Sequence, residues 1–367
     1  MGDKIIILKI GGSSITNKAL EETLDTEALK WFAKLISTCI DESIRSHSSS
    51  IDRSSRSECK PKFIIVHGAG SFGHHSAKRY GLRCGKSVFL DESVSVDEKS
   101  SNGTLDGVQF QYQMEGLSKT RHSVQKLNSA IVNSLLNHGV NAVGLSPGMS
   151  ISSLRAHGAT KRRGEECATD NSIAGMKLLC QSIHESLEAG LLPVIHGDAC
   201  LLYDGKRAGI LGGDTLVEGI ATLWDESTAA TNETGDRLGR SAISQVIFIT
   251  DVAGVFTSDP KSDRNAKLIR HLSVNSTTGE LSIVDTKDNM NMNTSSASSL
   301  NVSGSSHAHD VTGGLKAKLG AAVAIVQSGI DVIITQCLSE STEAFIAGTW
   351  KSVWDLDSGT LISPSRT

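Results

Sequence analysis

The amino-acid sequence predicts an α/β fold, an αβα sandwich built on a central, mostly parallel β-sheet. Short β-rich apolar segments alternate with longer segments of helical periodicity. Four of the apolar segments also end in turns that contain glycine or aspartate. Strands that alternate with helices form a parallel sheet covered on both faces. A length of 367 residues and an apolar fraction of 38% are sufficient for a sizeable core.

Five apolar segments account for the predicted strands. They comprise residues 5–10, 63–66, 192–195, 246–249 and 332–334. Three amphipathic stripes predict helices between these strands, and glycines follow the second and third stripes as stop signals. The stripes are Leu29, Phe32, Ile36 and Ile40; Val124, Leu127, Ile131 and Leu135; and Leu179, Ile183 and Leu187, with Gly139 and Gly190 as the stops.

Four polar stretches interrupt this alternation, near residues 41–60, 86–106, 224–242 and 273–310. We expect them to be surface loops inserted into a compact fold. Solvated linkers are the ordinary interpretation, and a regulatory or phosphorylated segment is the alternative. The chain length alone fits two average domains or one large α/β domain. No internal repeat is visible.

The charge and the cysteine pattern limit the classes of partner and compartment. A net charge of −4 gives no global attraction to nucleic acid or to an acidic membrane. No apolar run is long enough for a membrane span or a signal-peptide core. Seven scattered cysteines without a C-x-x-C pair fit reduced thiols better than disulfides or a zinc site. We therefore expect a cytoplasmic protein.

The turn after the second predicted strand, G-A-G-S-F-G at 68–73, matches a dinucleotide fingerprint. Any turn that brings backbone N–H groups close to an anion needs glycine for the same reason. A nicotinamide site is disfavoured because no second strand ends in an acidic residue about 20 residues further on. His74 follows the turn and would point at its ligand, whereas His67 and His75 are interpreted as structural or solvent-facing.

The turn after the first predicted strand contains K-I-G-G-S at 9–13. A lysine within an apolar strand is costly unless its ammonium meets a negative group at the strand end. We expect Lys9 to contact phosphate; the alternative is that its ammonium extends to the surface. Lys18 alone would be interpreted as an ordinary surface lysine, and only the motif beside it suggests a role. The P-loop, protein-kinase and H-E-x-x-H motifs are all missing from the sequence.

Further glycine turns lie at 197–198, 212–214, 250–260 and 310–318. In the last of them, Thr-Gly-Gly opens a predicted helix whose positive N-terminus suits a phosphate, and Lys318 follows about one turn later. Glycine turns and lysines at separate strand ends favour two phosphate-bearing ligands that meet head to head. This is the geometry of phosphoryl transfer, which depends mainly on positioning and charge neutralisation.

The order of K-I-G-G-S, H-G-A-G-S-F-G-H, T-D-V-A-G-V-F-T-S-D-P and D-V-T-G-G-L-K-A-K resembles the amino acid kinase superfamily. Within it, the sequence is most similar to the isopentenyl phosphate kinases, from about residue 4 to about residue 348. His74 is the most discriminating element. Fosfomycin-phosphorylating relatives share it, and acetylglutamate, uridylate and aspartate kinases are not expected to have it.

The resemblance implies a single domain over residues 1–367. It also implies a homodimer that uses ATP and Mg²⁺ to convert isopentenyl phosphate into isopentenyl diphosphate for isoprenoid biosynthesis. Lys9, Lys18 and His74 would be catalytic: Lys9 would neutralise charge on the transferred group, Lys18 would stabilise the transition state, and His74 would bind the acceptor phosphate. The implied ATP site comprises Lys9, Gly11, Gly12, Ser13, Gly70, Asp251, Phe256, Gly314 and Lys318. The implied substrate site comprises Ala69, His74 and Gly197. Asp198 and Asp214 would each orient a lysine or cap a helix.

Two departures and two alternatives accompany this assignment. Ala69 replaces the middle glycine of its turn, and Phe256 stands where many relatives carry Tyr. The alternatives are a kinase of the same fold with another small acceptor, and a non-catalytic binding protein. An apolar pocket beyond His74, for which Tyr80, Leu82 and Ile151 are candidate walls, would favour an isoprenoid tail, and a Lys/Arg-lined pocket would favour a carboxylate.

Overall fold

The computed structural model describes residues 4–48, 61–82, 104–147, 170–201, 208–228, 242–260, 263–284, 299–300 and 313–365. Its centre is a ten-stranded sheet with the order β12-β11-β10-β14-β13-β7-β1-β2-β4-β3. The six strands from β13 to β3 run parallel to one another, whereas β14 pairs antiparallel with β13. The strands are β1 (Lys4–Ile10), β2 (Lys62–His67), β3 (Ala142–Leu145), β4 (Leu192–His196), β7 (Ala242–Thr250), β10 (His271–Val274), β11 (Leu281–Ile283), β12 (Ser299–Leu300), β13 (Asp331–Gln336) and β14 (Thr360–Pro364).

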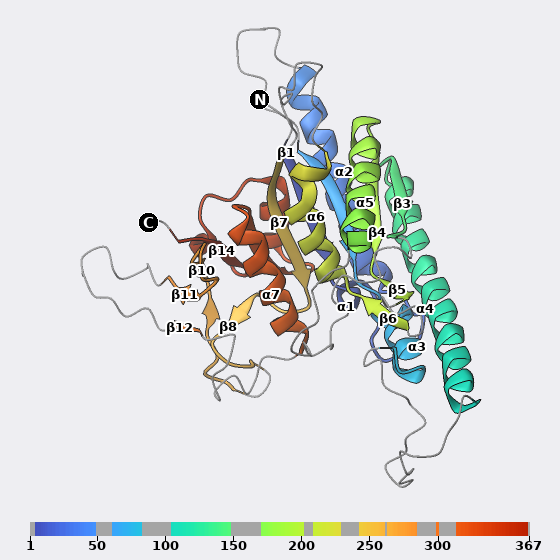
Figure 1. The fold of residues 1–367 in the computed structure, drawn as a ribbon. Coiled ribbons are helices and arrows are strands. Elements are labelled where there is room, and N and C mark those ends of the chain that lie inside the picture. The colour runs from blue at the N-terminus through green and yellow to red at the C-terminus, as the bar shows by residue number, and fades with distance from the viewer. Residues whose placement is uncertain are drawn as a thin grey trace, which may run out of the picture.

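Helices cover both faces of this sheet (Figure 1). One layer contains α5 (Asp170–Glu188), α6 (Gly213–Ser227) and α7 (Gly313–Gln327), and the other contains α2 (Thr26–Ser48), α4 (Thr104–Asn137) and α8 (Glu340–Ala347). Alternate residues of β1 face opposite layers, because successive side chains of a strand point to opposite faces. Ile5 and Ile7 pack with the α5–α7 layer, and Leu8 and Ile10 pack with the other.

The predicted fold class is confirmed, and each of the five predicted strands is present with somewhat longer bounds. The three apolar stripes lie on α2, α4 and α5. Gly139 and Gly190 follow the last two helices with φ of 79° and 76°, the left-handed conformation that suits glycine after a helix. Among the described helices, none combines the length and apolarity needed to cross a bilayer.

The interpretation of the four polar stretches as surface loops is wrong in part. Helix α2 continues through residues 41–48, and α4 already begins at Thr104. Trp224 is buried in α6, because it lies on the apolar face of that helix. The stretch 273–310 contributes the end of β10 and all of β11 and β12 to the sheet. The remaining parts of the four stretches lie mostly outside the described residues.

The carboxyl ends of β1, β2, β4 and β7 are aligned at one edge of the sheet, since Ile10 is level with His67 and Ile249, and His67 with His196. Short elements follow at this edge, at the lower end of the sheet in Figure 1. They are α1 (Gly12–Ile15), the 3₁₀ turn η1 (Gly70–Phe72), α3 (His74–Arg79) and the hairpin of β5 (Asp198–Leu201) and β6 (Ala208–Leu211). This is the edge where ligands bind in open α/β sheets.

Candidate active site

Two lysines share one carboxylate at the edge formed by the carboxyl ends of the strands. Lys9 leaves β1 on the side of the α5–α7 layer, and its Nζ lies 2.6 Å from Asp214 Oδ1 in the first turn of α6. Lys318 Nζ, from α7, lies 3.4 Å from Asp214 Oδ2. Lys9 is only 6% exposed, so it does not snorkel to the surface. The carboxylate therefore holds two ammonium groups from different elements side by side.

The charges of this cluster are perturbed by burial and by one another. Burial and the neighbouring Lys9 charge lower the pKa of Lys318 to about 8, although Asp214 partly offsets them. Burial alone would raise the pKa of Asp214, but the two lysines outweigh it and hold that pKa below its ordinary value. Two ammonium groups and one carboxylate leave one net positive charge. Such a buried excess of positive charge favours binding of an anion.

The first two glycine turns touch backbone to backbone beside this cluster. A Cβ on Gly12 would lie 2.1 Å from the amide nitrogen of Gly70, a distance that leaves no room for a side chain. Gly70 itself has φ of 51°. Thr16 connects the turns, because its hydroxyl donates to Gly12 O at 2.7 Å and accepts from Ser71 N at 3.0 Å. Glycine is therefore required here by close approach, and at Gly70 also by backbone conformation.

Lys18 and Asp251 form an ion pair at the same edge of the sheet. Lys18 Nζ donates to Asp251 Oδ2 at 2.7 Å, and both side chains are largely exposed. Asp251 directly follows β7. His75 Nε2 lies 3.2 Å from Lys18 O, so this histidine contacts the main chain of the lysine loop. An exposed ion pair of this kind is weak and can open to admit a ligand.

The residues assigned to the acceptor lie at two turns: His74 and Ala69 flank the second glycine turn, and Gly197 lies in the turn between β4 and β5. His74 is exposed at the start of α3, Ala69 precedes η1, and the Gly197 amide donates to His67 O at 2.9 Å. An apolar cluster lies next to His74, between α3, α4 and the β5–β6 hairpin. Its buried members are Ala77, Tyr80, Leu82, Leu117, Ala199 and Ala208. Leu82 and the Tyr80 ring thus pack among apolar side chains, whereas the Tyr80 hydroxyl contacts Glu115 and Lys119. Ile151 lies outside the described residues.

The remaining predicted site residues occupy neighbouring positions. Gly11 donates its amide to Ile249 O at 2.8 Å, and Ser13 is half-buried in α1. Gly314 lies in the first turn of α7, as the Thr-Gly-Gly helix start predicts. Phe256 is half-buried in β8 (Val255–Phe256), opposite Leu268 of β9 (Leu268–Ile269).

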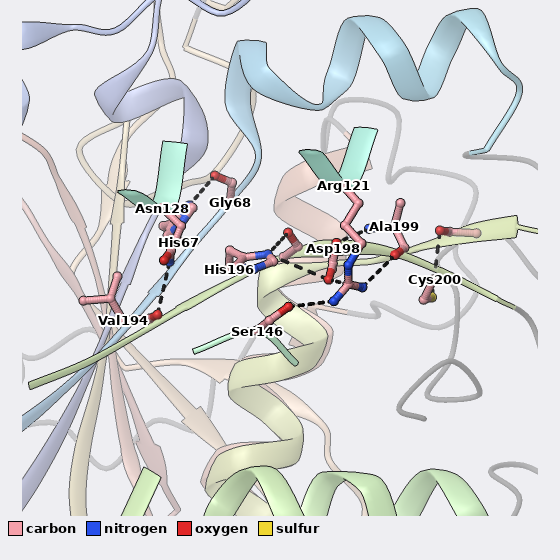
Figure 2. Close-up of polar contacts among 12 residues, drawn as sticks. His67, Gly68, Arg121, Asn128, Ser146, Val194, His196, Asp198, Ala199 and Cys200 are labelled. Atoms are coloured by element: carbon pink, nitrogen blue, oxygen red, sulfur yellow. Dashed lines mark hydrogen bonds and ion pairs between the residues drawn. The ribbon is translucent and has the colours of Figure 1, made fainter. Parts of the chain in front are cut away.

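A buried polar network lies around His196 and Asp198, and the sequence did not predict it (Figure 2). Arg121 Nη1 of α4 lies 2.6 Å from Asp198 Oδ2, and Asn128 Nδ2 of the same helix lies 3.1 Å from His67 Nε2. The alternatives for Asp198 are therefore wrong: it pairs with an arginine, and it begins a strand, not a helix. Asp214 does orient lysines. The sequence did offer one signal for this network: the polar residue Asn128 lies within the apolar stripe of α4.

An exposed carboxylate of the site suits a magnesium ion that arrives on a nucleotide. Within the described ranges, no group of three or more His, Cys, Asp or Glu side chains is arranged to hold a metal. Mg²⁺ usually keeps several waters and binds one or two carboxylates together with substrate phosphates. Asp251 is exposed beside Lys18, so it fits Mg²⁺ bound as its ATP complex, whereas both oxygens of Asp214 contact lysines.

Comparison with known proteins gives one consistent family. The amino acid kinase family matches residues 4–228 and 241–336. Isopentenyl phosphate kinase from Arabidopsis thaliana is 27% identical over 93% of this chain and 90% of its own length. The enzyme of that name from Methanothermobacter thermautotrophicus is 27% identical over 89% of each chain.

Solved structures share the fold. An X-ray structure of isopentenyl phosphate kinase has a TM-score of 0.57 at 24% identity and covers 98% of this chain and 100% of its own. The product complex of the Thermoplasma acidophilum enzyme has a TM-score of 0.55 at 19% identity, with 98% and 100% coverage.

Proposed function

The chain belongs to the amino acid kinase family, and we propose that it transfers the γ-phosphoryl group of ATP to isopentenyl phosphate, forming isopentenyl diphosphate. The Lys9–Asp214–Lys318 cluster carries this proposal. It holds net positive charge at the strand edge, beside two glycine turns in direct contact. Relatives that cover about 90% of the chain carry the name of this activity.

The chemistry required of the protein is mainly charge neutralisation and alignment. The acceptor is already an anion, so no strong base is needed, and the obstacle is repulsion between two phosphates. Lys9 and Lys318 offset that repulsion from the buried side, and Lys18 does so from the exposed side once it leaves Asp251. When bound, Mg²⁺ neutralises charge on the nucleotide phosphates.

The acceptor is held by groups on the other side of the contact between the turns. His74 and the backbone amide of Ala69 bind its phosphate, which lies against the Gly197 segment; the Gly197 amide itself donates to His67 O. Either charge state of His74 has an N–H to donate to a phosphate oxygen. The apolar cluster around Tyr80 and Leu82 supports a hydrocarbon tail over a second carboxylate.

We further propose that the enzyme is a cytoplasmic homodimer. Leu136 of α4 and Leu178 of α5 are 50% and 62% exposed. Both helices lie at the β3 end of the sheet (Figure 1), and an edge strand with exposed leucines nearby suits contact with a second copy.

A coupled ADP-release assay with MgATP tests the activity. Isopentenyl phosphate is compared with fosfomycin, N-acetylglutamate and UMP, for the wild type, His74→Ala and the control His138→Ala. We expect turnover with isopentenyl phosphate only. We expect a loss of at least ~100-fold in His74→Ala, equivalent to about 2.7 kcal/mol, because a transition-state contact is removed.

His138 is a suitable control because its ring contacts Ser134 O on α4, before the start of β3 and away from the glycine turns. Full activity in His74→Ala would refute the role of His74. Turnover with a different acceptor would leave the fold assignment intact and replace the substrate. No turnover with any acceptor would contradict the proposed activity.

A further inference from the structure

One face of α4 contacts both turns that hold the acceptor. Arg121, Val124 and Asn128 are separated by three and four residues, which places them on the same side of a helix. A Cβ on Gly73 would lie 3.1 Å from Val124 Cγ2, so α4 packs closely under the turn that precedes His74. On either side of this contact, Arg121 reaches the start of β5 and Asn128 reaches the end of β2.

Asn128 fixes the end of β2. Its Nδ2 group lies 3.1 Å from His67 Nε2 and donates to Val194 O at 3.1 Å. His67 Nδ1 lies 3.0 Å from Gly68 O, and a carbonyl oxygen only accepts, so the His67 proton is on Nδ1 and Nε2 accepts from Asn128. Burial lowers the pKa of His67 to about 3, which keeps the ring neutral at pH 7.

Arg121 fixes the start of β5 (Figure 2). Its guanidinium lies 2.6 Å from Asp198 Oδ2 and donates to Ser146 Oγ at 2.7 Å and to Ala199 O at 3.5 Å. The Asp198 side chain is 0% exposed. Its other oxygen accepts from the amide of Ala199 at 2.9 Å.

Gly197 lies between two anchored residues. His196 Nδ1 donates to Gly197 O at 3.1 Å on the preceding side, and Asp198 follows directly. The Gly197 amide already points to His67 O, at the end of the strand that Asn128 fixes. The position of this glycine therefore depends on two side chains of α4.

We propose that Arg121 is a positioning residue for the acceptor: through Asp198 it fixes the Gly197 segment against which the acceptor phosphate binds. The inference rests on the proposed function, which places the acceptor at Gly197. Arg121 does so through protein groups, because its planar fork is directed at a carboxylate, a hydroxyl and a carbonyl. Lysine keeps the charge but has no planar fork, so it cannot reproduce all three contacts in this geometry.

Steady-state kinetics test the proposal with Arg121→Lys, Asp198→Asn and the double variant Arg121→Gln/Asp198→Asn. Glu188→Gln is the control, since Glu188 pairs with Lys62 at the opposite ends of the strands. We expect the KM for isopentenyl phosphate to rise at least ~10-fold while the KM for ATP stays within about twofold. The control should change neither value. Equal changes in both KM values, or no change, would overturn the proposal.

Amide hydrogen exchange provides a second test. It does not depend on the substrate, and it uses a variant that is expected to fold even if the single variants do not. Removing one partner leaves a buried charge unpaired, whereas the double variant removes both charges and is expected to fold. Amide hydrogen exchange of residues 197–201 should be faster in the double variant than in the wild type, with α5 unchanged. Unaltered exchange at 197–201 would refute the positioning role. A wild type inactive on isopentenyl phosphate but with the expected exchange would refute only the proposed substrate.

Discussion

At the scale of single residues, Asp214 organises the site because it contacts two lysines from different elements. The two lysines that it joins are 309 positions apart in the sequence, Lys9 and Lys318. Without Asp214, two buried ammonium groups would face each other without a compensating negative charge. The carboxylate thus offsets part of the cost of burying both ammonium groups.

The shifted pKa of Lys318 predicts how ATP use depends on pH. Its pKa is lowered to about 8, so the positive charge is present below pH 8 and is lost as the pH rises above it. We expect kcat/KM for ATP, which reports the free enzyme, to decline above about pH 8. In Lys318→Arg the decline should disappear, because a guanidinium stays charged over this range. A decline at the same pH in both proteins would assign it to another group.

At the scale of elements, the contact between the first two glycine turns sets the geometry of the site. Gly12→Ala should destabilise the fold by about 1–3 kcal/mol, because the new methyl group meets backbone atoms that have no freedom to move away. It should also reduce kcat by separating the turns. Thermal unfolding and the ADP-release assay measure the two effects.

Gly320→Ala is the matched control for this prediction. Gly320 is exposed within α7, and a Cβ there would meet nothing within 4 Å. Alanine at this position should be neutral or stabilise the fold by about 0.5–1 kcal/mol. Equal stability of the Gly12→Ala variant and the wild type would show that the turns can separate without cost.

The sequence was most informative where a single element carries the signal. Strand runs, helix stripes and glycine turns are local patterns, and they located the strands around the site. The pairing of Asp198 with Arg121 was not predictable, since nothing near Asp198 in the sequence indicates an arginine on α4. Residues 41–48 were misjudged for a related reason: their polar composition suits a loop and an exposed helix end equally well.

At the scale of the whole molecule, the parallel part of the sheet stops at β3, where exposed leucines lie on α4 and α5. Light scattering should give twice the chain mass of 38.8 kDa. In Leu136→Glu/Leu178→Glu, two buried charges would oppose association, and the single-chain mass should appear. Leu338→Glu, an equally exposed leucine in the turn after β13, should leave the mass unchanged. A single-chain mass for the wild type would exclude the proposed dimer.

The contact between Gly12 and Gly70 also affects how such an enzyme can diversify. In the proposed binding mode, the spacing between donor and acceptor is set there by main-chain atoms, which side-chain replacement elsewhere leaves in place. Substitutions in the apolar cluster of Tyr80 and Leu82 would then alter the proposed contact with the tail without disturbing the distance over which the phosphoryl group moves. Selection or engineering for new acceptors should succeed in that cluster and fail at the two glycines.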